Sequence, residues 1–378
     1  MIDIVEVKTK KDIKEFVRFP LRLYQGVSSF VPMLYGDEKK LLLSGGKTDT
    51  SESVFFLAKK DGKTVGRIQG ILQKQSNALK NEKKIRFTRF DSIDDASVSR
   101  ALFGAVEAWG ASLGMDTLCG PLGYSDLDRE GLLIDGFAEE STYEEQYSYP
   151  YYPKLLEDYG FRKDVDWLEF ELKAPEQPNA MLARVAERAL TMNKLHIADR
   201  SMPKRAYIEK YADSFFDTID ICYSKLYGVM PITEEQRREL VLQFKLVINI
   251  KYTVFICDEK ENVVAFGLAF PAFGDAIKKS GGRLTPLTLL RLLRTIKHPK
   301  KLDLGLVAVR PEYQNTGINA VIIHGLVQML TQDGIEKCET NLNLETNTAV
   351  MAQWKYFTAR QHKRRRAYIK EIGGNENA

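Results

Sequence analysis

The sequence lacks the features that mark secreted, membrane-spanning and disulfide-rich proteins. Its first six residues, MIDIVE, include two acids and do not form the apolar core of a signal peptide. No uninterrupted apolar run approaches the roughly 20 residues that cross a bilayer. The four cysteines among 378 residues are far apart and form no CxxC pair, so we expect reduced, mostly buried thiols. These absences predict a cytoplasmic protein that has no membrane partner.

Charge and histidine spacing argue against two further classes of protein. The 55 basic residues barely outnumber the 51 acidic ones, and the net charge of +4 is too small to indicate a nucleic-acid partner. The histidines show no spacing typical of metal ligands; they are His196, His298, His324 and His362. We therefore predict neither a metal nor a nucleic-acid partner, and the function has to be sought in individual sites.

The pattern of predicted elements occurs twice along the chain. Two half-buried strands joined by a short turn are predicted at residues 54–71 and again at residues 253–268. Each hairpin is followed by a strand, a helix, a second strand and a second helix. We predict these at residues 85–90, 96–113, 117–120 and 152–159 in the first half, and at 304–309, 319–332, 337–344 and 348–357 in the second. The repeat predicts two equivalent domains, which the chain length also favours.

The boundary between the two predicted domains lies near residue 175. Residues 173–179 contain two prolines and no apolar pattern, which is typical of a linker. We therefore assign residues 1–175 to one domain and 176–378 to the other. Helices are predicted at 180–190 and 233–247, and a basic segment with an amphipathic middle at 287–296 interrupts the second half only.

A polar turn between a strand and a helix is the most informative part of the second half. Residues 304–309 are apolar, residues 314–319 read QNTGIN, and a helix follows. Such a turn directs backbone N–H groups and the positive end of a helix dipole at one spot, which suits a pyrophosphate. A helix start that is capped and binds no ligand is the alternative. The corresponding residues 89–95 of the first half contain three carboxylates, which would repel a phosphate, and Asp94 and Asp95 are predicted to cap the next helix.

In these residues the chain resembles the GNAT superfamily of acyl-CoA N-acyltransferases. Gln314 and Gly317 match the pyrophosphate-binding pattern of that family, while Asn319 stands where the pattern has glycine or alanine. The resemblance covers both halves and implies an α/β (α+β) fold: two tandem GNAT-like domains, each with a mixed, mostly antiparallel sheet flanked by helices. It also implies acetyl-CoA or another acyl-CoA as co-substrate, held by Leu306, Val307, Ala308, Val309, Gln314, Asn315, Thr316, Gly317, Ile318 and Asn319.

The same resemblance indicates candidate catalytic residues after the fifth strand of the second half. Glu345 is the preferred general base, acting through a water, and Asn347 matches an asparagine of the family; the alternative is that both cap the next helix. The tyrosine that serves as general acid in the family aligns with Trp354, which cannot release a useful proton. Tyr356 could replace it only if the helix register is shifted.

Three hypotheses about function remain open at this point. The first is an acyl-CoA-dependent N-acyltransferase that moves an acetyl or longer acyl group directly to an unidentified amine. The second is a catalytically silent GNAT-fold protein that binds a small molecule or a partner. A Fem-type transferase, which uses aminoacyl-tRNA, is the third. The basic run at residues 360–366 is predicted to be a solvated edge strand, with contact to a phosphate-rich ligand as the alternative.

Overall fold

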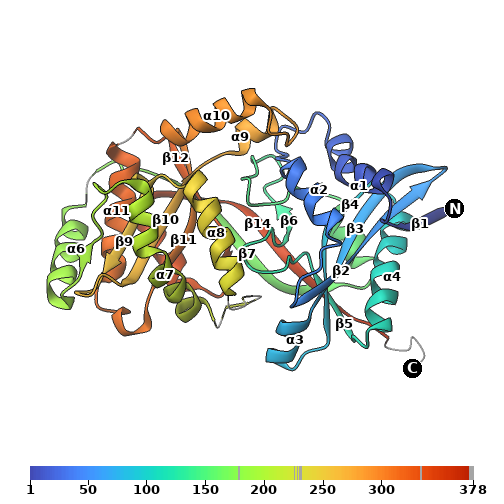
Figure 1. The fold of residues 1–378 in the computed structure, drawn as a ribbon, viewed down its shortest axis with the longest axis horizontal. Helices are drawn as coiled ribbons and strands as arrows, with labels where there is room; N and C mark the ends of the chain where they lie inside the picture. The colour runs from blue at the N-terminus through green and yellow to red at the C-terminus, as the bar shows by residue number, and fades with distance from the viewer. Residues whose placement is uncertain (178, 225, 228, 230–231, 333, 374–378) are drawn as a thin grey trace. The chain divides into compact units, whose positions relative to one another are not determined.

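The computed structural model describes residues 1–177, 179–224, 226–227, 229, 232–332 and 334–373, which form mixed helices and strands (Figure 1). The chain divides into two compact units. Unit 1 contains Met1–Leu168, Gly274–Leu289 and His362–Ala378, and unit 2 contains Glu169–Phe273 and Leu290–Gln361. Each unit therefore combines segments that are distant in sequence. The ranges 1–175 and 176–378 remain a prediction about where the two repeats meet.

Unit 1 is built on a mixed, mostly antiparallel sheet. Its strands follow the order β1-β2-β3-β4-β5, and only the β4–β5 pair is parallel; the strands are β1 (Ile2–Glu6), β2 (Ser51–Lys60), β3 (Lys63–Gln73), β4 (Lys84–Ser92) and β5 (Thr117–Gly120). The last strand, β14 (Thr358–Glu371), pairs with β5 and with β6 (Leu132–Asp135). The predicted hairpin of β2 and β3 is confirmed, and its turn residues Asp61 and Gly62 both have positive φ.

The helices of unit 1 pack against two different sets of side chains on this sheet. They are α1 (Lys10–Leu23), α2 (Tyr35–Leu43), α3 (Lys74–Lys80), α4 (Ala96–Ser112), α5 (Tyr152–Glu157) and α9 (Gly274–Lys278). On β2, Phe55 and Leu57 cluster with α1, whereas Phe56 and Ala58 belong to the cluster of α4. Alternate residues of a strand face opposite sides of a sheet. The continuous apolar run at residues 54–58 is therefore explained by burial on both faces, and the expectation that this strand is only half-buried is wrong.

Asp95 caps α4, as the sequence predicts. Its carboxylate accepts hydrogen bonds from the N–H of Ser97 (2.9 Å), the hydroxyl of Ser97 (2.6 Å) and the ammonium of Lys60 (3.1 Å). The hydrogen bond from the Ser97 hydroxyl, followed by those from Lys60 and the Ser97 N–H, lowers the pKa of Asp95 from 3.8 to about 2. The charged cap therefore stabilises the fold above the ordinary pKa, and this contribution is lost as the pH falls toward 2.

We expect Asp95→Ala to lower the free energy of unfolding by about 1 kcal/mol at pH 7. Asp95→Asn keeps an acceptor oxygen, so its free energy of unfolding should fall by less than that of Asp95→Ala. Urea unfolding of the native chain and both variants at pH 7 and again near pH 2 to 3 measures the difference. If Asp95→Ala lowers the free energy of unfolding by the same amount at pH 7 and near pH 2 to 3, the negative charge of Asp95 contributes nothing to stability.

Unit 2 repeats the strand order of unit 1. Its sheet follows β7-β12-β11-β10-β9-β8, again with a single parallel pair, β11–β12. The strands are β7 (Arg162–Lys173), β8 (His196–Ile197), β9 (Thr253–Cys257), β10 (Val263–Pro271), β11 (Lys301–Val309) and β12 (Lys337–Thr340), and the short β13 (Asn343–Leu344) pairs with β7. β7 begins in unit 1, and only its residues from Glu169 onward belong to unit 2. β4 and β11, the equivalent strands of the two units, each have a register irregularity against the preceding strand. The internal repeat predicted from the sequence is thus present in the strand order and the pairing.

The helices of unit 2 are α6 (Ala180–Asn193), α7 (Lys204–Tyr223), α8 (Glu234–Val247), α10 (Pro286–Lys297), α11 (Ile318–Gln332) and α12 (Thr348–Met351), with 3₁₀ turns η1 (Ile250–Tyr252), η2 (Pro311–Tyr313) and η3 (Ala352–Tyr356). α10 begins in unit 1 and ends in unit 2. α6 and α11 share one apolar cluster, and α7 and α8 share another. The sequence analysis missed α7, which buries Tyr207, Tyr211 and Phe215. Across the described residues, no helix is both long and apolar enough to cross a bilayer.

The basic run in β14 is not a solvated edge strand, so that expectation is wrong. Lys363 and Arg365 are fully buried and both contact the carboxylate of Glu145, at 3.1 and 3.2 Å. Arg366 pairs with the buried Asp166 at 2.8 Å. Acids distant in sequence therefore compensate these charges inside unit 1. The same pairing weakens the alternative that this run binds a phosphate-rich ligand.

Candidate functional site

The last residues of β11 have one open edge. β11 pairs with β12 only as far as Leu304, whereas its pairing with β10 continues to Val309. Gly305 lies at the register irregularity, and a Cβ there would come within 2.5 Å of the Phe270 ring. Beyond Leu304, backbone groups directed away from β10 are therefore available to a side chain or a ligand. Leu306 and Val307 are half-buried along this edge, and Ala308 and Val309 are buried.

The hydroxyl of Tyr223 occupies this edge. It accepts a hydrogen bond from the N–H of Val307 at 3.2 Å and donates one to the carbonyl of the same residue at 3.0 Å. Tyr223 is the last residue of α7, which lies outside every motif that the sequence analysis used. No pattern in the sequence indicates this contact, because the two residues are 84 positions apart.

The turn between β11 and α11 has the geometry of an anion site. Asn315 and Gly317 have φ values of 62° and 89°, and the side chain of Gln314 donates to the carbonyl of Val309 at 3.1 Å. Within the described part of the chain, the N–H groups of residues 315–319 have no hydrogen-bond acceptor. Free N–H groups at alternating dihedrals and at a helix start bind anions well. The cofactor-binding role of Gln314, Asn315, Thr316, Gly317, Ile318 and Asn319 remains a prediction.

Gly317 is required in this turn for two reasons. Its positive φ strains any other residue, and a Cβ would lie 3.2 Å from the Cβ of Ala189 and 3.6 Å from Val185 on α6. Asn319, in contrast, is exposed at the first turn of α11. The asparagine side chain therefore has room to turn toward solvent.

The three candidate catalytic residues lie on a segment that begins just after β13. Glu345 is half-buried, and Asn347 caps α12 by accepting a hydrogen bond from the N–H of Val350 at 3.3 Å. The capping alternative is thus confirmed for Asn347. Trp354 is buried in the apolar cluster and its indole N–H has no acceptor among the described residues, while Tyr356 is half-buried beside it. The catalytic roles of Glu345, Asn347 and Tyr356 remain predictions.

Unit 1 contains a polar cavity of its own, which the sequence analysis did not predict. Two ion pairs form its floor: Arg67 with Asp91 at 2.7 Å, and Arg89 with Glu38 at 2.8 Å. Arg89 has a φ of 50° at the register irregularity of β4, a conformation that non-glycine residues rarely adopt. Apolar side chains of α1 and of the residues that follow it line the cavity as well, together with the polar side chains of Thr88, Asp128, Arg129 and Gln146.

Burial and ion pairing have opposite effects on the pKa of the carboxyl groups in this cavity. Burial raises the pKa of the Glu38 carboxyl, but Arg89, Arg67 and Arg129 more than offset it, so the pKa lies below its usual range. For Asp91 burial prevails over Arg67, and the pKa of this carboxyl is raised. Each buried charge in the cavity is therefore stabilised by a neighbouring charge of opposite sign.

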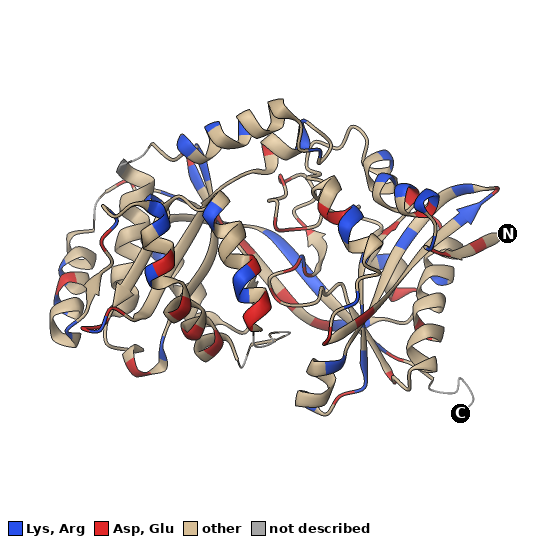
Figure 2. Ribbon diagram, viewed as in Figure 1, with Lys and Arg blue, Asp and Glu red and all other residues tan. Residues whose placement is uncertain are grey.

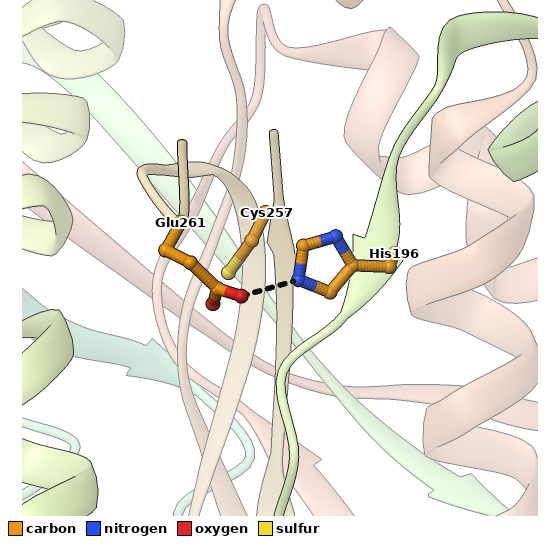
Figure 3. Close-up of side chains that lie close together, drawn as sticks. All are labelled: His196, Cys257 and Glu261. Atoms are coloured by element: carbon orange, nitrogen blue, oxygen red, sulfur yellow. Dashed lines mark ion pairs between the residues drawn. The ribbon is translucent and has the colours of Figure 1, made fainter. Parts of the chain in front are cut away.

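A cluster of possible metal ligands lies on β8 and the β9–β10 hairpin (Figure 3). Ligand atoms of His196, Cys257 and Glu261 lie within 4.8 Å of one another, and the imidazole of His196 is 3.4 Å from Glu261. Glu261 is already paired with Lys210 at 2.9 Å. Burial, followed by the charge of Glu261, raises the pKa of the Cys257 thiol to about 12, so the thiolate that a metal requires is disfavoured. These residues fit a hydrogen-bonded structural cluster better than a metal centre.

Comparison with known proteins identifies the fold of the chain. No family model matches the chain. It is 26% identical over 371 residues to Protein YghO of Escherichia coli, and the match covers 96% of this chain and 94% of that protein. It is also 24% identical over 383 aligned positions to the bacterial ceramide synthase of Caulobacter vibrioides, and that match covers 98% of each protein. A solved tandem GNAT protein from the clavulanic acid biosynthesis pathway superposes with a TM-score of 0.56 and 12% identity over 99% of both chains. The chain has the tandem GNAT fold. The α/β (α+β) prediction is thereby confirmed.

Proposed function

We propose that the protein is an N-acyltransferase that moves an acyl group from acyl-CoA to an amine. The observation that carries this proposal is the turn at residues 314–319, whose free N–H groups lie next to the open edge of β11. The turn suits the pyrophosphate of coenzyme A, and the edge at Val307 suits the amide and thioester groups that follow it. Both belong to unit 2. The equivalent position in unit 1 holds Arg89, which pairs with Glu38, and Asp91, which pairs with Arg67.

The transfer would be direct. Glu345 accepts a proton from the amine through a water, the amine nitrogen bonds to the thioester carbonyl carbon, and the carbon–sulfur bond breaks. The backbone N–H of Val307 would stabilise the carbonyl oxygen as negative charge develops, once the substrate has displaced the Tyr223 hydroxyl that now accepts a hydrogen bond from this N–H at 3.2 Å. Tyr356 is the candidate that returns a proton to the leaving thiolate, because Trp354 cannot. The amine loses one proton and the thiolate gains one, so the reaction involves no net change in protons.

The relative from Caulobacter suggests which acceptors to test. Ceramides are amides, so the name of that protein fits the same kind of bond formation. Amines that carry long apolar chains therefore belong in the acceptor panel beside small amines and polyamines.

A binding protein without catalysis is the second candidate. Trp354 stands at the position of a general acid, and the Tyr223 hydroxyl fills the edge that an acyl group would need. Release of free thiol from acyl-CoA in the presence of the amine panel separates the two candidates, since a binding protein releases none.

Coenzyme A and acetyl-CoA should raise the melting temperature of the native chain and fail to raise that of Gly317→Glu. A ligand at 100 times its dissociation constant adds about 2.7 kcal/mol to the free energy of unfolding. The added carboxylate repels phosphate, and the new Cβ would lie only 3.2 Å from the Cβ of Ala189 on α6. Gly114→Glu is the matched control, because Gly114 also has positive φ but has open space around it. A native chain that does not shift with either ligand would overturn the proposal.

Tyr223→Phe should bind coenzyme A derivatives more tightly, by about 5- to 100-fold. The phenylalanine lacks the hydroxyl that satisfies both backbone groups of Val307, so an incoming ligand no longer has to displace those two hydrogen bonds, each worth about 0.5 to 1.5 kcal/mol. Isothermal titration of acetyl-CoA into both proteins measures the ratio. Weaker binding by the variant would mean that Tyr223 contacts the ligand and does not compete with it.

A further inference from the structure

Helix α10 exposes an unusual number of leucines. Only Thr288 is buried along the helix, while large apolar side chains around it are open to solvent: Leu284, Leu287, Leu289, Leu290 and Leu293. Leu290 and Leu293 are 65% and 63% exposed. Globular proteins usually turn the apolar face of a helix toward a core. α10 does the opposite, so its apolar side chains require a partner outside the fold.

The charges on and around α10 have one sign. Residues 281–301 contain six basic residues and no acid; the basic residues are Arg283, Arg291, Arg294, Lys297, Lys300 and Lys301. Three of them, Arg291, Arg294 and Lys297, lie within α10, which has blue segments in Figure 2. Arg294 and Lys297 are exposed and form no ion pair with another described residue. At 100° per residue they fall on the same side of the helix as Leu287 and Leu290. The exposed side therefore combines apolar contact area with uncompensated positive charge.

We propose that α10 binds flat in the interface of a bilayer that contains anionic lipids. The leucines would enter the boundary between head groups and acyl chains, and the flanking cations would contact lipid phosphates. The helix has 12 residues, a length of about 18 Å, so it lies on a membrane and does not span it. A second copy of the chain is a poorer occupant, because pairing the same helix brings like charges together.

Vesicle co-sedimentation of the full chain tests this proposal directly. We expect binding to vesicles of phosphatidylcholine with about 30% phosphatidylglycerol, weaker binding to pure phosphatidylcholine, and release as NaCl rises from about 0.1 to 1 M and the Debye length falls from about 10 to 3 Å. Leu290→Gln/Leu293→Gln should reduce partitioning by about 10- to 100-fold. Arg294→Gln/Lys297→Gln should reduce it on anionic vesicles only.

A matched pair of leucines on another helix supplies the control. Leu242 and Leu246 of α8 are 64% and 74% exposed, and Leu242→Gln/Leu246→Gln should leave vesicle binding unchanged. Equal losses in both leucine variants, or equal binding to neutral and anionic vesicles, would overturn the proposal. It would also fall if the vesicle-free chain is an oligomer that the α10 leucine variant converts to monomers, because the leucines would then bind a second copy. Vesicle binding does not depend on acyl transfer. The membrane proposal can therefore fail while the proposed function holds, and the reverse.

Discussion

Glu38→Gln should lower the free energy of unfolding by about 3 to 5 kcal/mol, because it leaves the guanidinium of Arg89 without its counter-charge inside the cavity. Glu38 is 4% exposed, and its carboxylate accepts two hydrogen bonds from Nε of Arg89, at 3.0 and 3.2 Å, and a third from its Nη2 at 2.8 Å. It also lies 3.6 Å from Arg67. Glutamine keeps the shape but not the charge. For a unit of this size the melting temperature should fall by about 6 to 20 °C.

The pH dependence gives this prediction a second readout. The folded pKa of Glu38 is lower than its unfolded value, so its contribution is present above the unfolded pKa and lost as the pH falls through the folded one. The native chain should therefore lose stability in acid faster than Glu38→Gln does. Asp37→Asn is the control on the same helix, because Asp37 is exposed and forms no ion pair with another described residue. A cost below about 1 kcal/mol for Glu38→Gln would show that the pair is no stronger than a surface salt bridge.

The sequence was sufficient where function and fold depend on neighbouring residues. The hairpin at Asp61 and Gly62, the cap at Asp95 and the turn around Gly317 each follow from local preferences for dihedral angles and hydrogen bonds. The strand before the turn and the helix after it were also predicted, because their apolar patterns are continuous. Local rules therefore located the candidate anion site of unit 2.

The sequence was insufficient where a residue acts through a distant partner. Tyr223 reaches Val307 across 84 positions, and Glu38 reaches Arg89 across 51. The basic run of β14 reads as a solvated strand until Glu145 and Asp166, 218 and 200 positions away, neutralise Lys363 and Arg366. Such pairs leave no periodic signal in a single sequence. Three-dimensional contact, not propensity, decides whether a charge is solvated, buried or part of a site.

Glu345→Gln should lower kcat for acyl transfer by about 10²- to 10⁴-fold while leaving the affinity for acetyl-CoA unchanged. Glutamine is nearly isosteric with glutamate but cannot accept the amine proton, so the variant removes the base and keeps the shape of the side chain. Glu345 follows β13 and precedes the cap of α12, so the substitution spares both the strand pairing and the hydrogen bond of Asn347. Steady-state kinetics with the best acceptor amine, together with calorimetric titration of acetyl-CoA, separates the two effects.

Glu312→Gln provides the comparison, because Glu312 is an exposed glutamate on η2 beside the anion-binding turn. This variant should retain full kcat, and loss of a negative charge near the turn should if anything strengthen coenzyme A binding. If Glu345→Gln and Glu312→Gln have the same kcat as the native chain, no base is needed at Glu345, and the amine must arrive already neutral. A parallel loss of kcat and acetyl-CoA affinity in Glu345→Gln would instead assign Glu345 to the structure of the site, because a residue that acts only on the amine proton cannot change the binding of the donor.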